Sequence, residues 1–139
     1  MIFGESRFFS FKSKAEREKE EKEYSTWAFP HGQMQRDNLE KLMRELYPKE
    51  QMPFMMMGFL TCKELYGKYL EDTKSSELAV DILINEEKKY KNVIRKNEMA
   101  RCVAFVLADA ELDESCEYPS PEEMRKRIED IENLKRKRK

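Results

Sequence analysis

The sequence predicts an all-α protein, a single-domain helical bundle of about five helices. Residues that break helices are scarce, because the 139 residues include only four Gly and five Pro. Residues 68 to 118 contain neither, which suits long helices and not a sheet with many hairpins. The good helix formers Glu, Lys, Leu, Arg and Met are abundant. A chain of this length forms one domain, with a core that needs no disulfide or metal.

The composition indicates a compact core beneath a charged surface. Charged residues make up 40% of the chain, yet 40% is hydrophobic and 11% aromatic, which argues against wholesale disorder. The formal net charge of -1 disfavours a protein that coats nucleic acid or anionic membranes. The first residues do not resemble a signal peptide, and no apolar stretch approaches the ~20 residues of a membrane-spanning helix. We therefore expect a cytoplasmic protein without membrane contact.

Residues 1–30 form an arm that differs in composition from the bundle domain, residues 31–139. The beginning of the arm is too aromatic for a tail in solvent, and we expect part of it to dock: Phe3, Phe8, Phe9 and Phe11. Ser13 and Glu16 match a capping box, which starts a helix. The residues that follow, through Glu23, include only Ala15 as an apolar side chain, so an exposed helix and a disordered segment both fit them. An aromatic patch then precedes the break at residues 30–32: Tyr24, Trp27 and Phe29.

Two helices follow the break. The first has one buried stripe at helical spacing, formed by Leu39, Leu42, Met43, Leu46 and Tyr47, and it ends at Pro48. Pro53 opens the second helix in its first turn. That helix begins with an uncharged run, Met52–Leu60, which fits either an irregular core or an adaptable binding surface. The three consecutive Met residues of the run point in different directions around a helix, so at least one should face away from the central helix.

The next helix is capped by Ser75 or Ser76. Its apolar face continues sparsely to Ile94, and the β-branched run from Val80 to Ile84 leaves a strand as the alternative. Residues Met99–Ala110 are apolar on nearly all sides, so we expect them to form the central buried helix of the bundle. Asp109 is the one acid beside this run, and we expect it where the helix emerges into solvent.

The last helix has the clearest start, because Ser120 caps it, Pro121 is its first residue and Glu123 completes a capping box. Its apolar stripe is thin and consists of Met124, Ile128, Ile131 and Leu134. Such a stripe is typical of a peripheral helix, or of a helix that pairs with another chain. A basic tail, residues 135–139, follows it.

No arrangement of residues predicts catalysis, a cofactor or a metal site. His31 is the only His, and it lies in a Pro-His-Gly turn without a nucleophile motif. Cys62, Cys102 and Cys116 are odd in number and widely spaced, so they match neither a zinc pattern nor a disulfide framework. The Glu-x-x-His motif of carboxylate-bridged bundles and the Gly-x-Gly motif of phosphate loops are absent. An enzyme or small-ligand binder that uses a pocket in the bundle remains a third class.

The leading prediction is a non-enzymatic interaction or accessory protein that associates with itself or with a protein partner. Candidate contact residues are Met55, Met56, Met57, Phe59, Met124, Ile128 and Ile131. The simpler alternative for these side chains is a core within one chain, since apolar stripes at helical spacing usually face the core.

The second prediction is association with nucleic acid. It uses either a segment similar to a helix-turn-helix, residues 60–89, or the basic tail as an anion contact: Lys135, Arg136, Lys137, Arg138 and Lys139. Glu77 and Asp81 weaken the first version, because their carboxylates would repel phosphate where a recognition helix presents donors.

Overall fold

The computed structural model describes residues 13–95 and 98–137. These residues form α-helices and short 3₁₀ turns with no strand among them, which confirms the all-α prediction. In chain order the elements are α2 (Lys14–Ala28), α3 (Gln33–Leu46), η1 (Lys49–Gln51), α4 (Met52–Thr73), α5 (Ser76–Asn85), η2 (Glu87–Tyr90), α6 (Met99–Ala110) and α7 (Pro121–Lys137). The six described α-helices exceed the expected number by one, because the charged residues of α2 form a helix. No described helix is long and apolar enough to cross a membrane.

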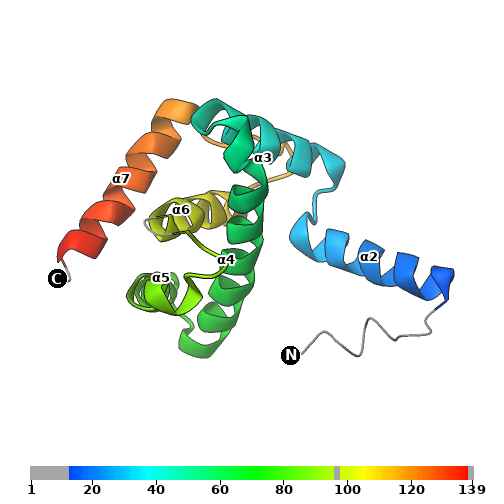
Figure 1. Cartoon of the computed structure of the whole chain (residues 1–139), viewed down its shortest axis with the longest axis horizontal. Helices are drawn as coiled ribbons and strands as arrows, with labels where there is room; N and C mark the ends of the chain where they lie inside the picture. Colours follow the sequence, from blue (N-terminus) through cyan, green and yellow to red (C-terminus); the bar gives the residue numbers. More distant parts are fainter. Residues whose placement is uncertain (1–12, 96–97, 138–139) are drawn as a thin grey trace.

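Helix α4 runs through the middle of the molecule, with α5 and α6 on one side and α2 on the other (Figure 1). It packs against both α5 and α6, and α6 packs in turn against α7. The buried face of α4 recurs at helical spacing and includes Met55, Phe59, Cys62 and Tyr66. Nine of the 12 residues of α6 are buried, so its expected position at the centre of the bundle is confirmed.

Helices α4 and α6 approach each other most closely at Gly58. A Cβ atom at this position would lie 2.9 Å from the Sγ atom of Cys102, closer than side chains tolerate without a shift. The absence of a side chain therefore lets the two helices pack at this point. Gly67 lies further along the same helix, where an added Cβ would meet nothing within 4 Å. Its missing side chain is not needed for packing.

The helix boundaries follow the local sequence signals. The Oγ atoms of Ser13, Ser75 and Ser120 each accept a hydrogen bond from the backbone N–H three residues later, at 3.1, 3.2 and 3.2 Å. Pro53 lies in the first turn of α4, as predicted. The run from Val80 to Ile84 is helical and not a strand.

One boundary differs from the predicted pattern. The apolar face of α5 was expected to continue to Ile94, but the helix ends at Asn85 and the chain continues as the 3₁₀ turn η2. The tighter turn places the Tyr90 hydroxyl 3.1 Å from the Tyr69 hydroxyl, which in turn donates to Glu86 at 2.6 Å. These polar contacts fix the end of the helix at a position that apolar spacing does not mark.

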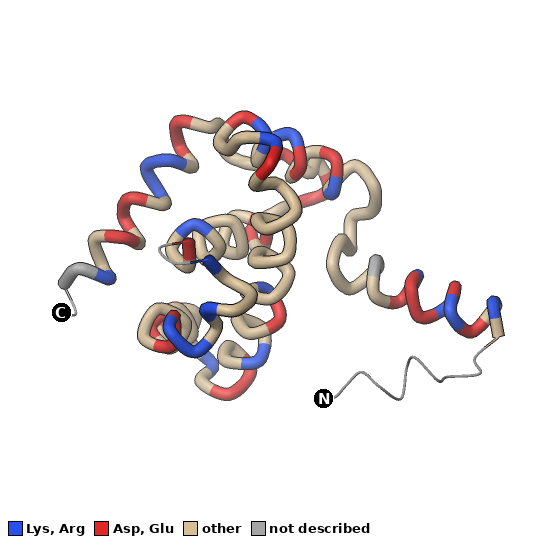
Figure 2. Tube along the Cα trace, in the orientation of Figure 1, with Lys and Arg blue, Asp and Glu red and all other residues tan. Residues whose placement is uncertain are grey.

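Charged residues follow one another along the first turns of α2 (Figure 2). Every described side chain from Ser13 to Tyr24 is exposed. Of the two alternatives that the sequence allowed, an exposed helix and a disordered segment, the structure has the exposed helix. The helix packs against the bundle only near its end, where Ala28 and Phe29 are buried. A helix that is polar all round gains nothing from burial, and α2 accordingly projects from the bundle (Figure 1).

Candidate functional site

A buried ion pair connects α4 to α6 beneath the end of α2. The Nζ atom of Lys63 lies 2.7 Å from Oδ2 of Asp109, and the two side chains are 17% and 4% exposed. Asp109 does lie in the last turn of α6, but its expected exposure at that position is wrong. A carboxylate can be buried there because a cation from another helix compensates its charge.

The ion pair is completed by hydrogen bonds from neighbouring elements. Oδ1 of Asp109 accepts from Nε2 of Gln35 and from the hydroxyl of Tyr118, both at 2.7 Å. Burial, together with the Asp109 carboxylate, raises the pKa of Tyr118, so its phenol keeps the proton that it donates. Lys63 also donates to the backbone carbonyl of Ala28, the last residue of α2, at 2.7 Å. We call these four side chains, Lys63, Asp109, Gln35 and Tyr118, the Lys63 network.

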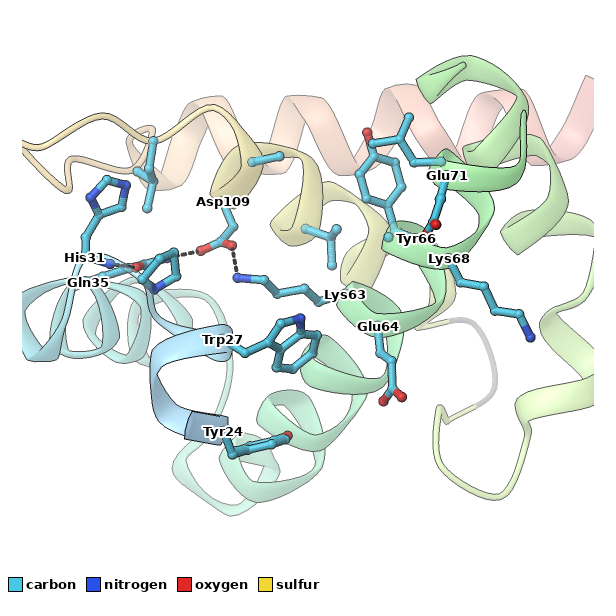
Figure 3. Close-up of a pocket in the computed structure, with 16 residues that line it drawn as sticks. Tyr24, Trp27, His31, Gln35, Lys63, Glu64, Tyr66, Lys68, Glu71 and Asp109 are labelled. Atoms are coloured by element: carbon cyan, nitrogen blue, oxygen red, sulfur yellow. Dashed lines mark hydrogen bonds and ion pairs between the residues drawn. The ribbon is translucent and has the colours of Figure 1, made fainter. Parts of the chain in front are cut away.

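The Lys63 network holds α2 in place by its last turn. A lysine at the carboxyl end of a helix satisfies a free carbonyl and interacts favourably with the helix dipole. Lys63 also lies 5.9 Å from the centre of the Trp27 ring, within the range of a cation–π interaction. Figure 3 shows Trp27 beside the Lys63 side chain, with Tyr24 about one turn earlier in α2.

The aromatic side chains of α2 stand over a groove on α4. The ring centres of Tyr24 and Trp27 are 5.6 Å apart. Tyr24 and Glu64 line two hollows. One, of about 410 Å³, is also lined by Pro53, Met56, Met57, Leu60 and Thr61. The other, of about 760 Å³, is also lined by Trp27, Lys63, Gly67, Lys68 and Glu71 among others. We call the two hollows together the α2–α4 groove.

The groove follows one face of α4. Along the middle of this face, lining residues recur every three or four positions: Pro53, Met57, Leu60, Glu64, Gly67 and Glu71. The α4 residues Met56, Thr61, Lys63, Tyr66, Lys68 and Leu70 also line the groove. At 1.5 Å per residue this face is about 27 Å long. Its beginning is apolar and its end is polar. The arrangement suits an extended or helical peptide with an apolar half, more than it suits a small polar metabolite.

The methionine run contributes to both the core and the groove. Met55 is fully buried, Met56 is half-buried and Met57 is 44% exposed. The expectation that at least one of the three faces away from the core is confirmed. Phe59, one turn after Met55, is also fully buried.

The predicted protein-contact residues of α7 are buried in the core of the protein. Met124, Ile128 and Ile131 are buried where α7 packs against α6. Their stripe therefore contributes to the core, as the simpler sequence alternative predicted. It is not available to another chain while α7 stays in place.

The described part of the basic tail is paired within the chain. Lys135 forms an ion pair with Glu87. The side chains of Arg136 and Lys137, and the residues Arg138 and Lys139, lie outside the described residues. In the segment similar to a helix-turn-helix, the first turn of α5 presents the exposed Glu77. These positions do not favour contact with phosphate.

The described residues contain no group of three or more His, Cys, Asp or Glu side chains that could hold a metal ion. His31 is exposed, and its backbone N–H donates to Oε1 of Gln35 at 2.9 Å. The three cysteines are buried and unpaired. Burial raises the pKa of Cys62, and it raises the pKa of Cys102 to about 12, so neither thiol ionises readily.

The sequence predictions did not include the Lys63 network as a site. Its only signals are that Asp109 is a lone acid beside the apolar run of residues 99–110, and that Lys63 directly follows the uncharged run that ends at Cys62. Nothing in the sequence indicates that these two charges, 46 residues apart, lie side by side. The sequence indicated the aromatic patch of Tyr24 and Trp27, but it did not indicate that the patch lies beside α4.

The chain matches no protein-family model, no curated protein and no solved structure.

Proposed function

We propose that this protein is a non-enzymatic helical interaction protein that binds an apolar protein segment in the α2–α4 groove and associates with itself through this surface. One observation carries the proposal. Tyr24, Trp27 and Met57 are 53%, 41% and 44% exposed, and all three lie around the same groove. Single exposed apolar side chains are common, but three along one groove indicate a contact surface, with Met57 at its smaller hollow, Trp27 at its larger hollow and Tyr24 at both.

The chemistry of the groove supports a protein ligand. Met57 and Met56 are flexible and polarizable, so they adapt to different apolar partners. Tyr24 and Trp27 are the residue types that dominate the energy of protein interfaces. Gly67 leaves the backbone of α4 open in the polar half of the groove, since a Cβ atom added there would meet no other atom within 4 Å.

The Lys63 network supports a structural role more than a catalytic one. Both oxygens of the Asp109 carboxylate accept hydrogen bonds from within the chain. Lys63 uses two of its three donors on Asp109 and Ala28. A base or nucleophile with its bonds already made to structural partners is poorly placed to act on a substrate. We keep a cytoplasmic setting as part of the proposal, because the three thiols are unpaired.

Static light scattering over a range of protein concentrations tests self-association. Met57→Glu places a charge on the exposed apolar side of the groove, so it should weaken the association measured for the unchanged chain. Leu78→Glu is the matched control, because Leu78 is 50% exposed but lies on α5, across α4 from α2. Circular dichroism should show the same helix content in both variants.

Two results would count against the proposal. A monomer at every concentration would contradict self-association. If Met57→Glu and Leu78→Glu weakened the association equally, the groove would not be the surface of association.

A further inference from the structure

We propose that the polar half of the α2–α4 groove recognises a cation, the guanidinium or ammonium group of the protein segment whose apolar side chain lies in the apolar half. This inference rests on the proposed function of the groove and names the chemistry of the segment that it binds. The cation site consists of the rings of Tyr24 and Trp27 and the carboxylate of Glu64, which all line the larger hollow.

Two exposed aromatic rings form one side of the cation site. The centres of the Tyr24 and Trp27 rings are 5.6 Å apart and their planes are inclined at 44°, so the rings are not stacked in parallel and neither covers the face of the other. The face of an aromatic ring attracts a cation within about 6 Å, and tryptophan does so most strongly. The Nζ atom of Lys63 lies 5.9 Å from the centre of the Trp27 ring, so this ring already has one such interaction.

A carboxylate without a counter-charge completes the cation site. Glu64 is exposed and forms no ion pair with any described residue. Burial, together with the Glu64 carboxylate, raises the pKa of Tyr24, which places the carboxylate close to that phenol. Figure 3 shows the Glu64 side chain directed away from the Lys63 ammonium group. A cation beside both rings can therefore also pair with Glu64.

The charges around the larger hollow favour a cation over an anion. Three carboxylates line it against two ammonium groups, and these residues are Glu64, Glu71, Asp109, Lys63 and Lys68. Asp109 compensates Lys63 at 2.7 Å, so this ammonium group neither repels a cation strongly nor attracts an anion strongly. The remaining lining charges are two carboxylates and one ammonium group, which leaves the hollow with an excess of negative charge.

The groove also sets the spacing of the bound segment. Glu64 lies seven positions after Met57, which corresponds to about 10 Å along α4. Three residues of an extended peptide cover the same distance at about 3.3 Å each. We therefore expect the segment to carry an apolar side chain and, three residues away, an arginine or a lysine. The apolar side chain contributes burial, and the cation fixes the direction of the segment in the groove.

The chain has a direct reporter for this contact. Trp27 is the only tryptophan, so its indole N–H gives a single side-chain signal in the ¹⁵N NMR spectrum of the full-length protein. The probe is the peptide acetyl-Phe-Ala-Ala-Arg-amide, which has the expected spacing. Acetyl-Phe-Ala-Ala-citrulline-amide is its matched control, because citrulline has the shape of arginine without the charge.

The arginine peptide should shift the Trp27 signal saturably, with a Kd about fivefold lower than that of the citrulline peptide. Glu64→Gln should remove most of this difference, because it takes away the charge at an exposed position and keeps the shape of the side chain. Asp72→Asn is the control variant and should leave the difference unchanged. Asp72 is an exposed acid of the same helix that does not line the groove.

Three results would overturn the inference. Equal affinity for the two peptides, or no shift with the arginine peptide, would reject the cation site. Tighter binding of acetyl-Phe-Ala-Ala-Glu-amide would show an anion site at Lys63 and Lys68 instead. Equal affinity for acetyl-arginine-amide and for the arginine tetrapeptide would indicate a site for small free cations, separate from the apolar half.

None of these peptide results decides whether the protein associates with itself. The effect of Met57→Glu in light scattering tests that part of the proposed function independently. A failed cation site and a failed groove are therefore distinguishable.

Discussion

Helices α2 and α7 are both rich in Lys, Arg and Glu, yet they attach to the bundle in different ways. Helix α7 has a thin apolar stripe along its length, with Met124, Ile128 and Ile131 buried. Helix α2 has no such stripe, and most residues of its first turns are charged (Figure 2). It is held at one end by Ala28, Phe29 and the Lys63 network.

The difference shows how attachment relates to function in this fold. Buried apolar side chains spread over about two turns, from Met124 to Ile131, couple α7 to α6, so α7 should unfold together with the core. A helix that is fixed only at its end can fray or move without disturbing the core. The groove with the exposed apolar side chains lies beside this weakly attached helix and not beside α7.

The largest effect should come from breaking the link at the end of α2. Lys63→Met leaves the buried Asp109 carboxylate without its cation and should cost about 3–5 kcal/mol in the free energy of unfolding. Trp27 should also become more exposed, because the carbonyl of Ala28 loses its partner. Urea denaturation and tryptophan fluorescence measure the two effects. Lys68→Met, at an exposed position of the same helix, should change the unfolding free energy by less than about 0.5 kcal/mol.

A smaller loss is expected from the middle of the α7 stripe. Ile128→Ala removes buried apolar surface against α6 and should cost about 2–3 kcal/mol of global stability. Lys126→Ala, on the exposed side of the same helix, is the control and should be close to neutral. If Ile128→Ala instead left stability unchanged but altered the oligomeric state, α7 would be an interface and the comparison with α2 would fail.

The smallest effect separates the two helices most clearly. Ser120→Ala and Ser13→Ala remove equivalent cap hydrogen bonds, each to the N–H three residues later. Ser120→Ala should lower global stability by about 1 kcal/mol, because α7 is coupled to the core. Ser13→Ala should leave global stability unchanged and only speed amide hydrogen exchange in the first turns of α2. A global loss from Ser13→Ala would show that the whole of α2 folds with the bundle.

The fold was predictable to a large extent because its signals are local. The serine caps, the Pro positions and the continuous apolarity of α6 each depend on a few neighbouring residues. The end of α5 was not predictable in this way. It depends on contact between Tyr69 and the pair Glu86 and Tyr90, which come together only when α4 and η2 are packed.

The candidate site was predictable only in part. The geometry of a helix requires that consecutive Met residues diverge, and Met57 is indeed the exposed one. The burial of Asp109 was not foreseen, because a lone carboxylate at a helix end is expected to face water. Its compensation by Lys63, Gln35 and Tyr118 involves three other segments of the chain.

The sequence by itself determined the helices of this protein and the composition of each face. Propensity, capping and periodicity act over a few residues, so they can be recognised without knowing the fold. Only the tertiary structure decided which charges are buried and which Met residue is exposed. It also decided that α2 lies over α4 to form a groove. These features depend on distances between segments far apart in the chain, and such distances are fixed by packing and charge compensation and not by local pattern.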